Sequence, residues 1–129
     1  MALDPAALPE EVLGFLAERH LASLTTLRAD GTPHVVPVGF AFDPKSGLVR
    51  VITGAGSQKA TNAARGGRAV VCQVDGRRWL SLEGRVTLTE EPQRVATAVA
   101  AYTGRYRQPG DNPSRVAIEI LVDRVLGRA

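Results

Sequence analysis

The segment VITGAGSQKATNAARGGRAVV, residues 51–71, contains the residue types of an anion-binding corner. A mostly β-branched run leads into Gly54-Ala55-Gly56, and Ser57 and Lys59 follow closely. Glycines let a backbone approach a ligand, and serine is a good helix N-cap. Lys59 would add a positive charge beside the free amide donors of a first helical turn, where anions bind well. The segment therefore suggests a phosphate site.

Two familiar phosphate motifs do not match this segment. The dinucleotide fingerprint requires a third glycine where Lys59 stands. The P-loop requires glycine directly before its lysine, and this chain has Gln58 there. The pattern gives no support to NAD or ATP binding, and an ordinary strand–turn–helix corner with an exposed lysine is the alternative interpretation.

Other side chains offer little catalysis of their own. His34 has no second histidine, cysteine or carboxylate at metal-ligand spacing, so an ordinary strand histidine is the favoured interpretation. Cys72 stands in an apolar run, which indicates a buried and unreactive thiol. The Gly-x-Ser-x-Gly elbow of serine hydrolases does not occur. An enzyme with this sequence must therefore take its chemistry from a cofactor, with no catalytic residue and no metal of its own.

A second group of candidates lies towards the C-terminus. Tyr102 and Tyr106 are one helical turn apart, beside Arg105 and Arg107. A solvated helix end is one interpretation, and a lid that presents arginines to an acidic substrate is the other. Trp79 fits either a core aromatic side chain or one at the edge of an interface or cofactor.

The composition limits the class of protein. The chain has 129 residues, 44% of them hydrophobic and 22% charged, which predicts a single globular domain over residues 1–129. The net charge is +3, but the arginines are scattered among acidic residues, so we expect no nucleic-acid partner. One cysteine, no signal-peptide pattern and no apolar run of about 20 residues predict a cytoplasmic protein outside the membrane.

Short elements joined by tight turns must position these residues. Cap and periodicity signals predict helices at about 9–19, 57–65 and 90–107. Alternation and turn signals predict six strands, at 21–28, 33–42, 48–53, 68–74, 79–89 and 115–125. Antiparallel strands with short helices, in a chain of this length, predict a mainly β fold built as a small closed or nearly closed barrel.

Four strings resemble the FMN-binding split β-barrel superfamily, the pyridoxamine-phosphate-oxidase-like proteins. They are FLAERHLASLTTLRADGTPHVVPVGFAFDPKSG, VITGAGSQKATN, QVDGRRWLSLEGRVTL and RVAIEILVDRVLG, which cover nearly all of the chain. Within the superfamily, these strings and the Tyr-x-x-Arg-Tyr-Arg stretch are most similar to the branch that uses the deazaflavin coenzyme F420, and to its F420H2-dependent biliverdin reductase group. The resemblance implies a six-stranded antiparallel split β-barrel that forms a homodimer with two cofactor sites at the interface.

The resemblance also implies which residues hold the cofactor. The set is His34, Val36, Pro37, Val51, Ile52, Thr53, Ser57, Lys59, Asn62 and Trp79. Residues 34–37 would face the tricyclic ring, and residues 51–53 would line it through their backbone. Trp79 would pack near the cofactor from the other subunit.

The phosphate half of the implied site is the corner described first. Ser57 and Lys59 would hold the phosphate, and Asn62 would lie beside the tail. Some relatives carry an arginine where Ser57 stands, so a phosphate here has one fewer fixed charge.

The implied activity is a reductase that transfers a hydride from reduced F420 to a conjugated acceptor. The expected acceptor is biliverdin, a linear tetrapyrrole, reduced at its central methine carbon to bilirubin. Arg78, Arg105 and Arg107 would pair with its propionates, because the guanidinium fork matches a carboxylate. Two alternatives remain: an FMN-dependent oxidase or reductase of the same fold, and a non-enzymatic flavin- or tetrapyrrole-binding protein.

Overall fold

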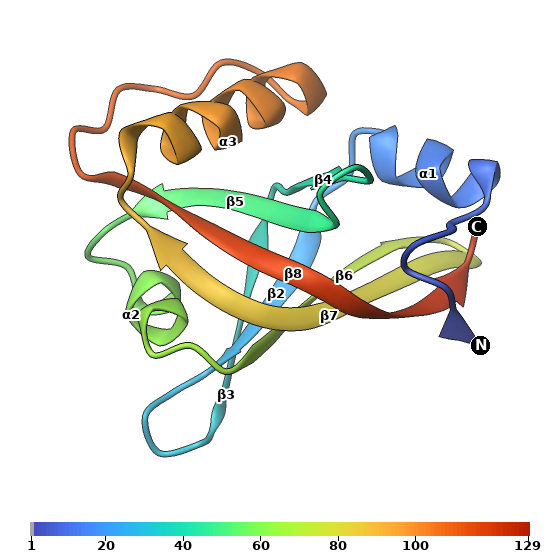
Figure 1. Ribbon diagram of the computed structural model, residues 1–129, viewed down its shortest axis with the longest axis horizontal. Helices are drawn as coiled ribbons and strands as arrows, with labels where there is room; N and C mark the ends of the chain where they lie inside the picture. The colour runs from blue at the N-terminus through green and yellow to red at the C-terminus, as the bar shows by residue number, and fades with distance from the viewer. Residues whose placement is uncertain (1) are drawn as a thin grey trace.

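The protein is built around one strongly curved antiparallel sheet, as the computed structural model of residues 2–129 shows (Figure 1). Its eight strands are β1 (Ala2–Leu3), β2 (Ala22–Leu27), β3 (Pro33–Val38), β4 (Ala41–Asp43), β5 (Leu48–Gly54), β6 (Arg68–Asp75), β7 (Arg78–Thr89) and β8 (Arg115–Arg128). Seven follow the order β3-β2-β6-β7-β8-β5-β4, and β1 pairs with β8. The prediction of a mainly β, antiparallel fold is confirmed.

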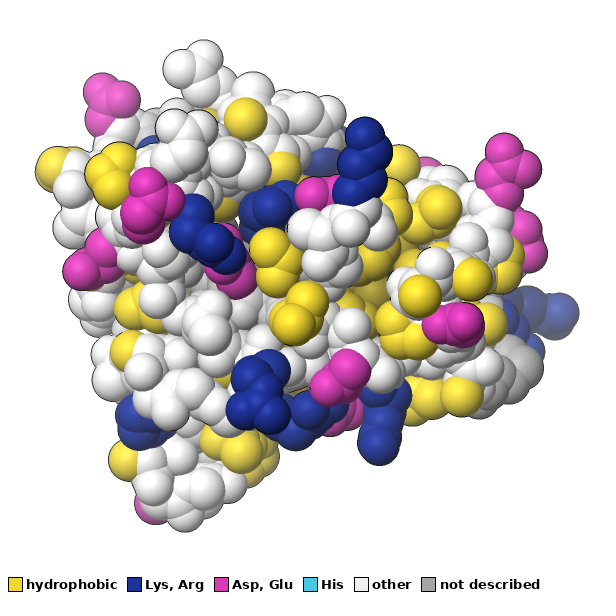
Figure 2. Space-filling model, in the orientation of Figure 1, with side chains coloured by type: hydrophobic (Ala, Val, Ile, Leu, Met, Phe, Trp, Pro, Cys, Tyr) yellow, Lys and Arg dark blue, Asp and Glu magenta, His cyan; other side chains and the backbone are white. Residues whose placement is uncertain are grey.

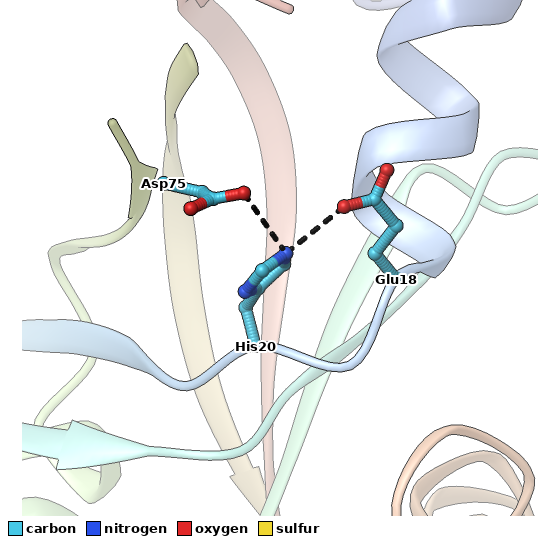
Figure 3. A group of neighbouring side chains, drawn as sticks. All are labelled: Glu18, His20 and Asp75. Atoms are coloured by element: carbon cyan, nitrogen blue, oxygen red, sulfur yellow. Dashed lines mark hydrogen bonds and ion pairs between the residues drawn. The ribbon is translucent and has the colours of Figure 1, made fainter. Parts of the chain in front are cut away.

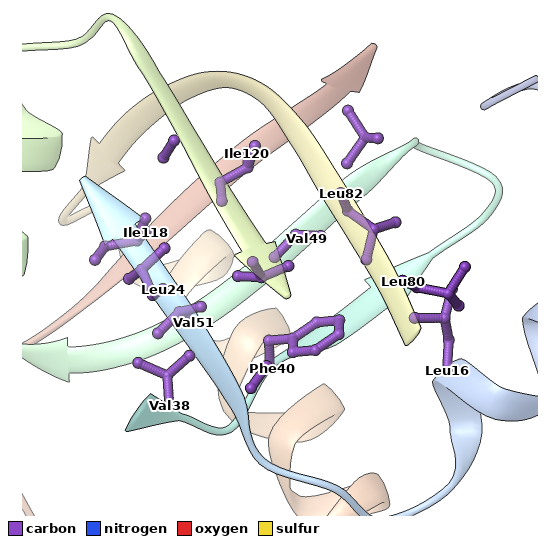
Figure 4. Packing of buried hydrophobic residues seen from close by; sticks show 14 of the residues in the cluster. Leu16, Leu24, Val38, Phe40, Val49, Val51, Leu80, Leu82, Ile118 and Ile120 are labelled. Carbon is purple, nitrogen blue, oxygen red and sulfur yellow. The ribbon is translucent and has the colours of Figure 1, made fainter. Parts of the chain in front are cut away.

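Alternation along the strands gives the sheet a buried concave face. In β2, Ala22, Leu24 and Thr26 are buried, and the residues between them are partly exposed. This period of two is the geometry of a strand with one face in the core. The inward side chains meet in a single cluster (Figure 4). The largest fully buried ones include Phe15, Phe40, Leu24, Leu80, Leu82, Ile118 and Ile120.

The strands at the two edges of the sheet, β3 and β4, follow one another directly along the chain. The predicted strand 33–42 is divided, so that β3 forms one edge and β4 the other, with Gly39 and Phe40 between them. Phe40 is fully buried, and its backbone bonds to side chains of residues 105 and 106 instead of to a strand. The prediction of six strands is therefore wrong, because residues 2–129 form eight strands. Of the predicted closed or nearly closed barrel, the closed form is excluded, because the sheet formed by these residues is not closed.

Three helices surround the sheet. They are α1 (Glu10–Ala17), α2 (Gln58–Ala64) and α3 (Pro92–Arg105). In Figure 1, α3 lies across β5 near β4, whereas α2 lies near the far ends of β5 and β7. The Glu91 side chain caps α3 by accepting bonds from the amides of Gln93 and Arg94. The helix ends two residues before the predicted 107, because Tyr106 leaves the helical conformation at φ −118° and ψ −87°.

Charges of both signs are mixed over the surface. On the face drawn in Figure 2, Lys and Arg side chains are interspersed with Asp and Glu, and apolar side chains lie in patches between them. Within residues 2–129, the structure contains no helix with the length and apolar character needed to cross a membrane.

Candidate functional site

A hollow of about 280 Å³ lies where the β3–β4 link, the end of β5, α2 and the loop before β8 meet. Its walls combine apolar and polar groups. The lining residues are Pro37, Val38, Gly39, Ile52, Thr53, Gly54, Lys59, Tyr102, Pro109, Asn112 and Arg115. Four of the predicted cofactor residues, at positions 37, 52, 53 and 59, are therefore brought together in one cavity.

Two cations share this hollow. Lys59 is half-buried, and within residues 2–129 its ammonium group has no hydrogen-bond or ion-pair partner. Arg115 pairs with Gly54 across β5 and β8, and its guanidinium donates to the carbonyl oxygen of Gly110 at 2.6 Å. Arg115 and Lys59 both line the hollow. The hollow is thus electropositive, and Gly54 keeps it open: a Cβ there would lie 3.3 Å from the Asn112 amide nitrogen.

Ser57 shapes the corner as a helix cap. Its hydroxyl accepts a bond from the Ala60 amide at 3.2 Å and shares a 3.0 Å bond with the Thr53 hydroxyl. The Ser57 amide donates to the carbonyl oxygen of Gly54 at 3.1 Å, which closes the turn. These bonds fix the direction of α2 and hold Lys59 towards the hollow. Ser57 is not among the lining residues.

Asn62 is buried behind the hollow. Its amide nitrogen donates to the hydroxyl of Thr26 at 3.0 Å, and its oxygen accepts bonds from Gln58 and Arg65, both at 2.8 Å. With 2% of its surface exposed, the side chain joins α2 to β2. The structure gives it a positioning role where the sequence predicted a contact with the cofactor tail.

The other predicted cofactor residues lie around this cavity or away from it. Val51 is buried in the core, and Val36 packs against the core from β3. His34 faces Thr26 across β2 and β3, and its buried Nδ1 has no hydrogen-bond partner within residues 2–129. Trp79 is the second residue of β7, whereas the hollow adjoins the β8 residues that pair with the opposite end of β7. Within one chain, Trp79 does not reach this cavity.

Arg105 is engaged inside the protein. It donates to the carbonyl oxygens of Glu18 at 2.8 Å and Phe40 at 2.6 Å, and to the Gln73 side-chain oxygen at 2.5 Å. Its guanidinium also lies 4.6 Å from the centre of the Phe40 ring, a cation–π distance. Burial lowers the pKa of Arg105. These contacts give Arg105 a structural role, and its contact with a substrate stays a prediction.

Arg78 belongs to a separate charged cluster, at the start of β7. It donates to Glu18 at 2.8 and 2.9 Å and to Asp75 at 2.5 Å. His20 Nε2 lies between the same two carboxylates, 3.0 Å from Glu18 and 3.8 Å from Asp75 (Figure 3). Hydrogen bonds from Arg78, and then from His20, lower the pKa of Glu18 to about 2. Arg78 therefore ties β6 and β7 to the end of α1, and does not line the cationic hollow.

Sequence reasoning missed several residues of the hollow, among them Gly39, Asn112 and Arg115. Asn112 and Arg115 stood in a segment predicted only as a polar loop followed by a strand, and no motif marks them. Gly39 stood inside a predicted strand, yet a Cβ there would lie 3.0 Å from both Tyr102 and Tyr106. Arg115 could have been found only from the register of β5 and β8. Gly54 pairs with Arg115 across these two strands, and this pairing brings Arg115 to the hollow that Lys59 also lines.

Comparison with known proteins places this geometry in a family. The family model described as pyridoxamine 5'-phosphate oxidase matches residues 8–129. The chain therefore belongs to the pyridoxamine 5'-phosphate oxidase family. It is 59% identical over 122 residues to a protein named F420H(2)-dependent biliverdin reductase from Mycobacterium tuberculosis (strain CDC 1551 / Oshkosh), covering 95% of this chain and 89% of that one.

Two solved structures share this fold. A conserved hypothetical protein from Mycobacterium tuberculosis is similar with a TM-score of 0.79 and 26% identity, over 95% of this chain and 85% of that chain. A structure titled F420 reductase is similar with a TM-score of 0.75 and 25% identity, over 92% and 98% of the two chains.

The residues of the hollow fit a planar ligand that carries a phosphate. Lys59 and Arg115 supply positive charge to the lining, and Ile52 and Pro37 supply apolar surface. This division suits a molecule with an anionic end and a conjugated ring, because charge-assisted bonds need donors while the ring needs a dry surface. In this member of the pyridoxamine 5'-phosphate oxidase family, the donor set is compatible with a flavin-type cofactor.

Proposed function

We propose that this protein is an F420H2-dependent reductase that converts biliverdin to bilirubin. The observation that carries the proposal is the 59% identity to the F420H(2)-dependent biliverdin reductase over 95% of this chain. The cationic hollow supports it, because it offers donors for a phosphate beside an apolar surface for a ring. The titled F420 reductase with the same fold supports the choice of cofactor.

The protein's part in this reaction is binding and orientation. When bound, reduced F420 supplies the hydride, which adds to the central methine carbon of biliverdin while solvent supplies the accompanying proton. Lys59 and Arg115 bind the phosphate, and Ser57 fixes the turn that presents Lys59. Pro37, Val38 and Ile52 exclude water from the ring side of the hollow. Holding the two reactants together accounts for most of the acceleration.

The proposed enzyme is a homodimer whose sites are completed across the interface. One chain provides about 280 Å³, slightly below the roughly 300–1,000 Å³ of typical ligand pockets. Beside it, sharing Pro37, lies an apolar hollow of about 410 Å³ on β2, β3 and β6. Leu21, Val35 and Val74 line it with 58–64% of their surface exposed. Such a patch is typical of an interface, and Trp79 of a second chain would then pack near the cofactor.

Mixing the purified protein with F420 and with FMN in separate titrations tests the cofactor. Binding is followed by the fluorescence of each cofactor. We expect F420 to bind and FMN to bind more weakly. Tight FMN binding without F420 binding would support the FMN-dependent alternative that family membership leaves open.

Turnover tests the reaction. Biliverdin is added to the protein with F420H2, and loss of its long-wavelength band is followed together with the appearance of oxidised F420. The expected result is one molecule of F420 formed for each molecule of bilirubin. Bilin binding without any oxidation of F420H2 would instead indicate a carrier.

A further inference from the structure

A second hollow lies beside the cationic one and shares a wall with it. It has a volume of about 330 Å³ and is lined by Arg19, His20, Leu21, Tyr102, Tyr106 and Arg107. Tyr102 lines both hollows, whereas Lys59 lines only the first, so Tyr102 is the residue that the two spaces share. A molecule in the second hollow would be directly next to a molecule in the first.

Two arginines in this hollow are not used by the fold. Within residues 2–129, neither Arg19 nor Arg107 has a hydrogen-bond or ion-pair partner, and both are exposed. Arg78 and Arg105 differ from them, because each makes three short bonds to other parts of the protein. The unused guanidinium groups are therefore available to a ligand.

The fold holds these two arginines near each other. Arg19 directly precedes His20, and Arg107 directly follows Tyr106. The Tyr106 hydroxyl donates to the His20 carbonyl oxygen at 2.6 Å, and thereby joins the two segments. One bond between positions 86 apart thus fixes the backbone beneath both cations. The fixed backbone keeps both arginines beside the same hollow.

We propose that this second hollow is the acceptor's carboxylate site, where Arg19 and Arg107 pair with two acidic side arms while Tyr102 and Leu21 contact the conjugated part. The proposal rests on the proposed function, since biliverdin carries two propionates on a conjugated framework. Bidentate guanidinium–carboxylate bonds are strong and directional. The arginine pair would therefore place the acceptor against Tyr102, next to the cofactor hollow.

The glutamate tail of F420 also carries carboxylates, so it is the competing ligand for these cations. The tail is attached through the phosphate, which we place at Lys59 and Arg115. Arg19 and Arg107 line the second hollow and not the first, whereas Lys59 lines the first and not the second. This arrangement favours the acceptor, and an experiment must separate the two.

The test compares biliverdin with its dimethyl ester, which lacks the charged arms. Arg19→Gln, Arg107→Gln and the double variant are assayed with both acceptors at saturating F420H2. Lys45→Gln, in the exposed β4–β5 turn, is a control that loses the same charge elsewhere. Each arginine variant should raise KM for biliverdin about 5- to 20-fold and leave KM for the ester within about twofold. The melting temperature and the F420 Kd should stay unchanged.

Two results would overturn the proposal. Equal losses with biliverdin and its ester would show that the arginines do not contact the propionates. Weaker F420 binding, with unchanged discrimination between acid and ester, would assign the pair to the cofactor tail.

Failure of the proposed function is detected separately, by absence of turnover in the unmodified protein. Binding of both bilins is then measured by the circular dichroism that a bilin acquires on a protein. If the unmodified protein binds biliverdin more tightly than its dimethyl ester and the double variant does not, the proposed carboxylate site is supported. If the unmodified protein binds both equally, the proposal is overturned.

Discussion

The hydroxyl of Tyr106 lies 2.6 Å from the carbonyl oxygen of His20, to which it donates a hydrogen bond. The same hydroxyl accepts a bond from the Phe40 amide at 3.2 Å. One side chain thus joins the residue after α3, the segment before β2 and the link between β3 and β4. Because that link lies where the sheet is not closed, the tyrosine holds together the two edges of the sheet. Burial raises the pKa of this phenol.

Replacing Tyr106 by phenylalanine should destabilise the fold. Tyr106→Phe leaves the His20 carbonyl oxygen and the Phe40 amide without their partner, which costs about 1–3 kcal/mol. Urea denaturation measures the change. Tyr102→Phe is a matched control, because within residues 2–129 the Tyr102 hydroxyl makes no hydrogen bond in the structure. Equal effects of the two variants would contradict the assignment.

Arg105 should contribute more to stability than a typical arginine. Arg105→Met keeps most of the side-chain volume but leaves the Gln73 oxygen, in a fully buried side chain, and two carbonyl oxygens without donors. The free energy of unfolding should fall by about 2–4 kcal/mol, because the oxygens of the buried residues Gln73 and Phe40 lose their donor. Arg107→Met, two positions along, should change it by less than about 0.5 kcal/mol. A loss confined to turnover would show that Arg105 faces a ligand instead.

Some features of the structure could be predicted from the sequence, and others could not. Local signals were reliable: Ser57 caps α2 as expected, and Asp30-Gly31 forms the β2–β3 turn with Gly31 at a φ of +85°. A capping serine or an Asp-Gly pair acts within a few residues, so its effect can be predicted from neighbours alone. The same holds for the alternation that predicted most of the strands.

Contacts between distant segments could not be predicted in this way. The sequence does not distinguish Arg105 from Arg107. In the structure, however, Arg105 donates hydrogen bonds to residues 18, 40 and 73, whereas Arg107 lines the second hollow. The break at Gly39 was hidden because it depends on Tyr102 of α3 and on Tyr106, the residue after α3, which both pack against it. Arg115 joined the site only through the register of β5 and β8. Each of these outcomes depends on topology, which a single sequence pattern does not contain.

The stabilising contribution of Glu18 to folding should be lost in acid. Its folded-state pKa, lowered from 4.5 to about 2 by hydrogen bonds from Arg78 and then His20, lies below the unfolded value. The contribution of Glu18 is therefore fully present above about pH 4.5 and is lost as the pH falls towards 2. Glu18→Gln should flatten the decline in unfolding free energy over this range. Arg78→Gln should flatten it as well, and parallel curves for variant and parent would remove Glu18 as a cause.

Lys59 should matter for cofactor binding and little for folding. Lys59→Ala removes a charge that has no partner within residues 2–129, so the melting temperature should change by only a degree or two. Loss of a charge-assisted bond to the phosphate should weaken F420 binding by about 1.5–3 kcal/mol, or roughly 10- to 100-fold. Fluorescence titration gives the Kd. Lys45→Ala, in an exposed turn, is the control, and equal affinities for all three proteins would remove Lys59 from the site.

The apolar hollow on β2, β3 and β6 gives the last prediction, which concerns the proposed dimer. Val35→Glu places a carboxylate on a side chain that is 58% exposed and lines this hollow, so burial against a second chain would leave the charge without water. The variant should elute as a monomer in gel filtration at concentrations where the parent is a dimer. It should also bind F420 more weakly, because Pro37 lines both this hollow and the cationic one.

Leu121→Glu is the matched control for Val35→Glu. Leu121 is 54% exposed on β8 but lies outside the apolar hollow, so its variant should remain dimeric with unchanged F420 affinity. Multi-angle light scattering gives the mass of each species, and circular dichroism establishes that both variants are folded. A parent protein that is monomeric at every concentration, yet binds F420 at full affinity, would show that one chain forms the complete site. Loss of the dimer in Leu121→Glu alone would instead place the interface on the outer face of β8.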